Sequence, residues 1–493
     1  MPNPPVALRW TSLQVRLPAV LLAVSLSACG PGPGGGGALP PPRDACETAA
    51  GWGELACGPV VESLAQDEQL HHGLVLVIGR AGVEAGELSV TADGGAPRSW
   101  PVVGGRFKAL VPLREGENVV LLRDGSSAPA RTLRLRLEPH PNPRFIRLVW
   151  VQAADGDGGF EGPVGTPRDA ESARKRLALG GLLLQSFTAE SLFLMGHGRR
   201  TFRLELEPDG MPRVETFRSA LTLAEARART GNELWSHFYG ELASLPRRED
   251  SIDLVLMTMT DWDGATKTAT AHTALGGGRL ALFGSGTLYS WPETLDGVVP
   301  AWTDARDVDT SLLMDDSAYR DRYWANFATG LGACLHELGH TLSLPHPASG
   351  RGVMAREFDH VNRLFMLEEP PSARSPGLSP VRPEDEKYWD PSHGHRLRWH
   401  AWLRQDGAPT PAGSGPSLRL EGGAFVAESA AGLRHLEYSV DGQSVDFDAF
   451  DGDVAPTRVE HPRTELSARL RASSIRVSAI DSQGRISEAD LEL

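Results

Sequence analysis

The sequence has no internal repeat, no coiled-coil heptad pattern and no excess of positive charge. The first two absences argue against a solenoid or a fibrous rod. The formal net charge of -14 at pH 7 argues against a nucleic-acid partner. The apolar run Leu17 to Leu26 is too short, and too closely followed by glycine and proline, for a transmembrane helix.

The first thirty residues carry an export signal. Arg9 and Arg16 precede the apolar run, and small residues lead from its end to Cys29. This pattern resembles a bacterial lipoprotein signal, which implies that residues 1-28 are removed and that Cys29 is lipidated. By the same resemblance, Gly30 favours the outer membrane, so we expect a protein of the cell envelope with a membrane anchor. A plain secretory signal is the alternative.

Cysteine is scarce, with 4 residues in the whole chain. Once Cys29 is assigned to lipid, Cys46 and Cys57 form a near pair, and we expect a disulfide between them, with two free thiols as the alternative. This pair lies in residues 29-65, a stretch that opens with glycine and proline and reads as a tether. Cys334 is expected to be a buried, packed thiol.

Residues 336-346 are the most informative segment of the sequence, because they contain the ligand set of a catalytic zinc site. Positions four apart share one helix face, so His336 and His340 can bind one metal ion together. Glu337 can reach a water on that metal and take its proton, which makes it the candidate general base. His346 lies past the helix, because a proline precedes it, and completes the ligand set. Three histidines leave one tetrahedral position open, which is typical of a catalytic zinc.

The sequence predicts that the helix carrying these residues runs from about Trp324 to Leu342. Its apolar residues recur at spacings of three and four, which predicts a buried stripe. Gly332 and Thr329 continue the histidine face backward, and we expect these small residues to leave space above the metal. Asp316 or Ser317 is expected to cap the start of the helix.

The motif resembles the signature of the metzincin zinc peptidases, in which a methionine turn follows the third histidine. Met354 stands eight residues after His346, where that turn belongs. The stretch from about 143 to 404 is also similar to a family of secreted or cell-associated zinc metallopeptidases best known from fungi. The similar segments are 196–204, the zinc helix, 352–363 and 396–400. The resemblance implies a zincin fold, one catalytic zinc ion and peptide hydrolysis.

Two positions depart from the metzincin pattern. Ser343 replaces the glycine that lets the chain leave the helix in a left-handed conformation, at a cost of about 1 kcal/mol. Phe358 follows Met354 where some metzincins supply a tyrosine, so zinc would do most of the oxyanion stabilisation itself. If His346 fails as a ligand, Glu357 is the runner-up.

Length and strand patterns predict three domains after the signal. Residues 66-142 read as short strands with turns and resemble a bacterial immunoglobulin-like domain, and 413-493 read as a second β-sandwich. The fold class is therefore multidomain α/β plus β, with a zincin domain flanked by two immunoglobulin-like β-sandwich domains.

The zincin domain, 143-404, shows the alternation of an α/β fold. Its predicted elements are strands at 145–152, 201–206 and 252–259, and a long helix at 168–195. Gly278 to Gly284 is the candidate edge strand beside the cleft, where an extended peptide would bind by adding a strand.

Two further groups of side chains could bind a metal ion. Acidic loops could hold structural calcium, against the alternative of solvated loops and a helix cap; they contain Asp155, Asp157, Asp304, Asp307, Asp309, Asp315 and Asp316. Three histidines near the end of the domain favour polar packing over a second metal; they are His393, His395 and His400.

Together these features predict a lipid-anchored zinc metalloendopeptidase with a protein or peptide substrate, in which Glu337 activates a zinc-bound water. Two alternatives stay open. One is a catalytically silent, zinc-containing binding lipoprotein, with Ser343 as the first sign of decay. The other is a zinc amidase that acts on cell-wall peptides.

Overall fold

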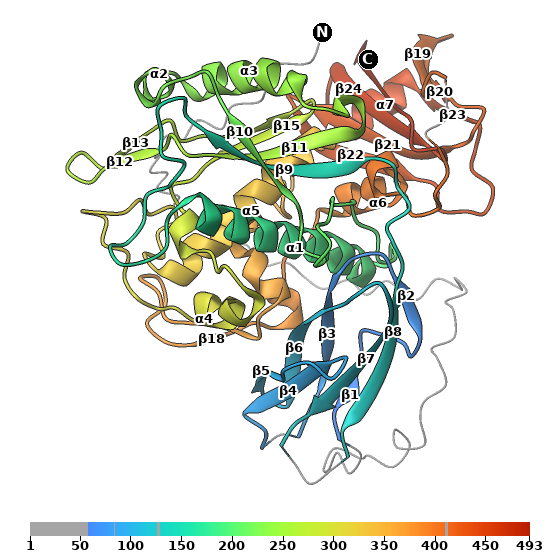
Figure 1. The fold of residues 1–493 in the computed structure, drawn as a ribbon. Coiled ribbons are helices and arrows are strands. Elements are labelled where there is room, and N and C mark those ends of the chain that lie inside the picture. The colour runs from blue at the N-terminus through green and yellow to red at the C-terminus, as the bar shows by residue number, and fades with distance from the viewer. Residues whose placement is uncertain (1–57, 83, 126–128, 410–412) are drawn as a thin grey trace, which may run out of the picture.

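The computed structural model describes residues 58–82, 84–125, 129–409 and 413–493. Three parts follow one another along the chain: an N-terminal β module, a central α/β domain and a C-terminal β module (Figure 1). The fold is thus multidomain and mixed, with much β-sheet. Cys29, Cys46 and Cys57 lie outside the described residues, so the lipid anchor and the disulfide stay predictions.

The N-terminal β module is one eight-stranded sheet in the order β1-β3-β6-β5-β4-β7-β8-β2. Its alternation is clearest in β8, where Leu133 and Leu135 are buried between exposed arginines. The module begins at Val60, inside the predicted tether, because β1 pairs with β3. The strands are β1 Val60–Val61, β2 Glu68–Leu70, β3 Leu74–Arg80, β4 Glu87–Ala92, β5 Arg98–Val103, β6 Arg106–Pro112, β7 Gly116–Arg123 and β8 Arg131–Leu137.

The central domain is built on a five-stranded sheet in the order β10-β9-β11-β15-β14. β9 and β11 are buried at every position, as expected for central parallel strands. Only β14 runs antiparallel to its neighbour. The strands are β9 Phe145–Gln152, β10 Val214–Arg218, β11 Ser251–Met257, β14 Ala274–Gly277 and β15 Leu280–Gly284.

Helices cover both faces of this sheet, with α1 (Ala170–Leu194) and α5 (Tyr323–Thr341) on one side and α3 (Gly231–Glu241) on the other (Figure 1). Asp169 caps α1 by accepting from the Ser172 backbone N–H. Within the described residues, α1 is the helix long and apolar enough to cross a membrane, but its apolar stretch lies buried in the molecule. It is placed as a core helix.

The sequence predictions for this domain were right for 145–152, 168–195 and 252–259, and wrong at two places. Residues 201–206 form only isolated bridges, and the strand beside β9 is β10. The predicted edge strand at 278–284 overlaps β15, which is interior because it pairs with both β11 and β14. The edge strand is therefore β14.

The C-terminal β module has two sheets, ordered β19-β20-β23 and β16-β22-β21-β24-β25. The strand β16 (His346–Pro347) belongs to the central domain by sequence, yet it extends the second sheet. The other elements are β19 Ser417–Glu421, β20 Ala424–Glu428, β21 Leu433–Val440, β22 Gln443–Ala449, β23 Arg458–Pro462, α7 Arg463–Leu470, β24 Ser474–Asp481 and β25 Ile486–Glu492. The immunoglobulin-like assignment of the two β modules stays a prediction.

Smaller elements complete the central domain. They are helices α2 Leu223–Arg227, α4 Val298–Trp302 and α6 Pro391–Trp399, strands β12 Asp261–Asp263, β13 Thr268–Thr270, β17 Glu368–Glu369 and β18 Ser379–Pro380, and 3₁₀ segments η1 Leu242–Ser244, η2 Arg248–Asp250, η3 Leu288–Ser290, η4 Leu295–Gly297, η5 Arg356–Leu364, η6 Pro383–Asp385 and η7 Ala401–Leu403.

Candidate metal centre

The helix α5 places two histidines and a glutamate at its buried C-terminal end. His336 is 2 % exposed and Glu337 1 % exposed. The predicted start of this helix was wrong, because α5 begins at Tyr323 after Arg322, which makes no side-chain cap. Asp316 and Ser317 lie earlier, before residues with positive φ that break the helical path.

Three imidazoles converge on one point. The Nε2 atoms of His336 and His346 lie 3.2 Å apart, and one ligand atom from each of the three histidines lies within 4.8 Å of the others. With zinc–nitrogen bonds of about 2.0–2.1 Å, two ligands of a tetrahedral site lie roughly 3.3–3.4 Å apart. The Nε2 atom of His340 is buried without a hydrogen-bond partner, as expected of a ligand atom. The residues therefore fit a zinc ion.

The backbone fixes the orientation of two of these rings. The Nδ1 atom of His336 lies 2.8 Å from the Val353 carbonyl oxygen, and that of His340 lies 2.9 Å from the Leu344 carbonyl oxygen. Because each Nδ1 donates its proton to a carbonyl, each Nε2 keeps a lone pair for a metal. Burial lowers the pKa of His340 to about 4 and the pKa of His336 well below its ordinary value, which keeps both rings in the neutral, ligating form.

Glu337 is a carboxylate buried from solvent beside this cluster. Its Oε2 atom has no hydrogen-bond partner among the described residues. Burial raises the pKa of Glu337 to about 8, and the Gly276 backbone offsets part of that rise. A carboxyl group with its pKa near neutrality can both accept and return a proton, which is what a general base needs. A bound cation would lower this pKa.

The edge strand β14 passes directly against the helix at Glu337. A Cβ atom at Gly276 would lie 2.0 Å from the Glu337 carbonyl oxygen, so only glycine allows this approach. The run of three glycines at 276–278 was the sequence signal for it, and it was missed. Among the described residues β14 pairs with β15 alone, so its outer edge has no strand partner.

Ser343 makes the turn that brings the third histidine back. Its φ is 59°, the left-handed conformation for which the pattern uses glycine. The Leu344 N–H donates to the Gly339 carbonyl oxygen at 3.1 Å and closes the helix end. The departure from the pattern therefore leaves the helix exit intact, and His346 reaches the cluster.

The C-terminal β module holds the strand that carries His346. His346 pairs with Gln443 and Pro347 with Ser444 in a parallel register. The Ala348 N–H donates to the Ser444 carbonyl oxygen at 2.7 Å. A predicted metal ligand is thus fixed by a segment about a hundred residues further along the chain, and no sequence pattern marked this pairing.

A buried polar network extends the contact through α6. Glu437 on β21 is 1 % exposed and accepts from Arg396 at 2.6 Å, from Ser392 at 2.7 Å and from Ser444 at 2.8 Å. The Nε2 atom of His393 lies 3.6 Å from the same carboxylate, and positive charge on His393 would act on His340 and His346. The network therefore links the module to the three-histidine cluster.

The other two histidines singled out in the sequence are packed and make no metal cluster with described residues. The Nδ1 atom of His395 lies 3.1 Å from that of His435, and its Nε2 atom lies 3.2 Å from Asp451. His400 is buried and accepts from the Trp402 N–H at 3.3 Å. Polar packing is the role the structure gives them.

The predicted methionine turn lies under the helix. Met354 is fully buried, and its Sδ atom would lie 2.2 Å from a Cβ atom placed on Gly339. Glu357, the runner-up ligand, accepts instead from the Gly352 N–H at 2.6 Å and from Lys387 at 2.9 Å. Glu357 therefore clamps the loop and is not part of the three-histidine cluster.

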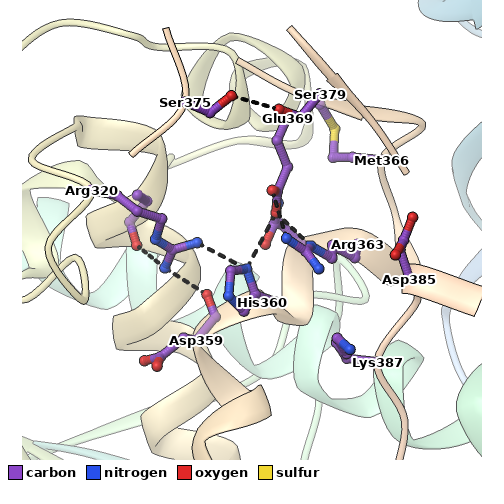
Figure 2. Close-up of polar contacts among 12 residues, drawn as sticks. Arg320, Asp359, His360, Arg363, Met366, Glu369, Ser375, Ser379, Asp385 and Lys387 are labelled. Atoms are coloured by element: carbon purple, nitrogen blue, oxygen red, sulfur yellow. Dashed lines mark hydrogen bonds and ion pairs between the residues drawn. The ribbon is translucent and has the colours of Figure 1, made fainter. Parts of the chain in front are cut away.

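The predicted space above the metal is filled by η5. A Cβ atom on Gly332 would lie 1.9 Å from the Phe358 carbonyl oxygen, and the Phe358 ring meets the His336 ring edge-on at 5.0 Å. Figure 2 shows what anchors this segment: Arg320 donates to the Asp359 carbonyl oxygen at 2.7 Å. The small residues on α5 thus serve close packing.

The same view shows the opposite end of η5 (Figure 2). Glu369 accepts from Arg363 through two bonds of 2.8 and 2.9 Å, and from Asn362 at 3.1 Å. His360 lies between this pair and Arg320, 3.4 Å and 3.2 Å from them. This cluster fixes the wall of the site that Phe358 forms.

Most of the acidic side chains predicted to hold calcium make local contacts instead. Asp155 accepts from the Leu223 N–H and Asp157 from the Gly159 N–H, both at 2.8 Å. Asp304 pairs with Arg306 at 2.5 Å. In the described parts of the chain, the three histidines are the group that could hold a metal ion. Calcium has no support.

Comparisons with known proteins agree with this centre. The chain is 29 % identical over 445 residues to a putative zinc metalloproteinase of Schizosaccharomyces pombe, covering 84 % of this chain and 71 % of that protein. It is 28 % identical over 483 residues to a putative zinc metalloproteinase of Saccharomyces cerevisiae, covering 87 % and 67 %.

A solved structure of catalytically inactive OgpA from Akkermansia muciniphila, in complex with an O-glycopeptide substrate, overlaps 71 % of this chain and 92 % of its own at a TM-score of 0.44 and 14 % identity. A similarity of this size supports no inference about fold or substrate. The family model described as "Metallopep: Putative peptidase family" matches residues 59–430. Because that match covers well over half of the chain, this protein belongs to the Metallopep peptidase family, and we class it as a zinc-dependent peptidase.

Proposed function

We propose that the chain is a zinc metalloendopeptidase in which His336, His340 and His346 hold the metal and Glu337 is the general base. The observation that carries this proposal is the convergence of three neutral imidazoles beside a buried carboxylate with one unsatisfied oxygen and a sheet edge that has no strand partner among the described residues. A zinc ion bound there would supply a Lewis acid and an acidified water.

The chain's own residues would supply binding and proton transfer. β14 offers backbone N–H and C=O groups to an extended peptide, which would lie antiparallel or parallel to it as an added strand. Glu337 would take the proton of the attacking water and return it to the leaving amine. The peptide bond would break between the carbonyl carbon and that nitrogen.

The test is a Glu337→Gln variant loaded with zinc and incubated with a complex peptide mixture. We expect the variant to lose about 10²–10⁴-fold in cleavage rate, because it lacks the base. New peptide ends are measured by mass spectrometry, and zinc content is checked by atomic absorption. The matched control is Glu357→Gln, which removes a carboxylate from the neighbouring loop and should still cleave.

Cleavage by zinc-loaded Glu337→Gln at the wild-type rate would refute this mechanism. If neither the wild type nor Glu337→Gln cleaves any peptide, with zinc bound in both, the result would favour a catalytically silent binding lipoprotein. Activity confined to cell-wall peptides would identify an amidase.

We also propose that the enzyme is held in the cell envelope by lipid at Cys29, with a Cys46–Cys57 disulfide at the base of its tether. The sequence pattern alone supports both. A Cys29→Ser protein should lose labelled palmitate and leave the membrane fraction, whereas Cys46→Ser should keep both. Thiol counting under denaturing conditions tests the disulfide, and two reactive thiols from this pair would refute it.

A further inference from the structure

A hollow whose lining includes none of the three clustered histidines lies where the central domain meets the C-terminal β module. Its volume is about 380 Å³. Residues 197–200, which follow α1, and residues 398–406, at the end of the central domain, form most of its wall, and Ser482 comes from the C-terminal module. The segments 196–204 and 396–400, both singled out in the sequence, therefore meet here, although neither holds a metal ligand.

The wall is basic in a protein of net charge -14. Four arginines and one aspartate line it. Three of those arginines have acidic partners: Arg199 pairs with Glu190 at 3.0 Å and also with Glu68, Arg398 pairs with Asp451 at 2.6 Å, and Arg404 pairs with Asp406. These pairs hold the wall together.

Arg200 is the remaining cation. It makes no side-chain hydrogen bond or ion pair with any residue that the structure describes, and it is partly buried. Burial lowers the pKa of Arg200 and nearby Arg398 lowers it further, while Asp406 offsets only part of this. A partly buried guanidinium with no hydrogen-bonded counter-charge would be stabilised by an anion bound beside it.

Three more polar nitrogens in the wall have no partner. They are the Nδ1 atom of His197, the Nε1 atom of Trp399 and the Nε2 atom of Gln405. Buried polar nitrogens are normally hydrogen-bonded, and the nitrogens of Trp399 and Gln405 can only donate, so an acceptor bound in the hollow would satisfy both. Trp399 also stacks against Arg434, whose guanidinium carbon lies 4.3 Å from the ring centre.

We propose that this hollow is a binding site for a compact oxyanion, a phosphate, sulfate or carboxylate group, with Arg200 as its main partner. The guanidinium fork suits two oxygens of such a group, and the unpartnered nitrogens of Trp399 and Gln405 could donate to it as well. The site is separate from the metal ligands, and binding there does not require turnover. It holds whether or not the proposed peptidase mechanism is right.

The test is calorimetric titration of inorganic phosphate into the zinc-loaded mature chain. We expect binding to weaken at least about tenfold in Arg200→Gln, which removes the charge and keeps most of the volume. Arg200→Lys should be intermediate, because it keeps the charge and loses the fork. The matched control is Arg213→Gln, an exposed arginine with its own acidic neighbours, which should bind as wild type.

Phosphate could also bind the open position of a zinc ion. The test therefore rests on the difference in phosphate affinity between wild type and Arg200→Gln. Equal binding by both proteins would place the anion on the metal and overturn the proposal. No heat at about 10 mM phosphate, enough to fill a site with a Kd of about 1 mM, would also overturn it. If Arg200→Gln fails to fold, selenate soaked into wild-type crystals decides, because its anomalous signal must appear in the hollow.

Two arms separate the sources of the anion. In the first, acetate and sulfate compete with phosphate and show which oxyanion fits best. In the second, a short peptide with one phosphoserine is compared with its unphosphorylated form. Tighter binding of the phosphopeptide than of free phosphate would identify a peptide-borne group, and equal binding would identify the free ion; both outcomes support the site.

Discussion

The two β modules attach to the central domain in different ways. The N-terminal module shares one apolar core with it, since β3 side chains such as Leu76 belong to the same cluster as Leu183 and Phe187 of α1. The C-terminal module has its own core around Phe425 and Tyr438, and meets the central domain through polar groups and backbone pairing. The first module is joined by apolar packing, and the second supports the metal loop.

Each module also contributes one buried ion pair. Lys108 of β6 pairs with Glu386 at 2.7 Å and donates to the carbonyl oxygens of Arg363, in the last turn of η5, and of Met366, just after it. Glu437 of β21 pairs with Arg396 of α6 beside the metal ligands. The comparison separates two roles: the N-terminal module adds packing to the shared core, and the C-terminal module holds the strand that carries His346 while it keeps a core of its own.

The largest effect is expected from Phe107→Ala in the shared core. Phe107 is fully buried, and its loss should cost about 3–5 kcal/mol of unfolding free energy. Because the core is continuous, the N-terminal module and the central domain should unfold together in calorimetry. Phe425→Ala is the control, and should lower a separate transition of the C-terminal module. A separate early transition in Phe107→Ala would contradict the shared core.

A similar loss of unfolding free energy is expected from Glu437→Gln, but the size of this loss depends on pH. Burial alone would raise the pKa of Glu437, yet Arg396, with His393 and His435, holds it at about 2. An unfolded glutamate titrates at about 4.3, so the ionised form contributes about 3 kcal/mol above that pH, and this is lost as the pH falls to about 2. Denaturation of wild type and Glu437→Gln should therefore differ at pH 7 and converge near pH 2. A constant difference would contradict the pairing.

Metal affinity should distinguish the two ion pairs. Glu437→Gln should weaken zinc binding, but by less than the roughly 10–100-fold cost of losing a direct partner of a ligand, because Glu437 acts through Ser444 on the strand that pairs with His346–Pro347. Lys108→Met is the matched change in the other module and should leave zinc affinity unchanged. Competition with a chromogenic chelator measures both. Equal losses would show that the modules do not differ in their support of the site.

The smallest effect is expected at Ser343. Glycine removes the strain of a positive φ, so Ser343→Gly should stabilise the protein by about 0.5–1 kcal/mol. Ser236→Gly, in the exposed face of α3, is the control and should destabilise by a similar amount. Thermal unfolding measures both. A destabilised Ser343→Gly would mean that the serine side chain stabilises the turn.

The sequence predicted the site better than the sheet around it. Spacing alone placed His336, His340 and Glu337 on one helix end, because that relation is local. The sequence prediction failed for β14, because a short strand with two glycines has almost no hydrophobic pattern. It also failed for the start of α5, where Asp316 was expected to cap the helix. Instead, the Asp316 backbone N–H donates to the side-chain oxygen of buried Asn326. The pairing of His346 with Gln443 had no local signal at all.

What the sequence determined by itself was the candidate site: two imidazoles and one carboxylate at helical spacing, with a third imidazole just beyond the end of the helix. Helix geometry repeats every few residues and is written into the order of the side chains. The tertiary structure decided which strand forms the edge of the cleft and which domain fixes the third ligand. Those contacts join segments far apart in the chain, and they form because long-range packing and buried charge select one partner among many.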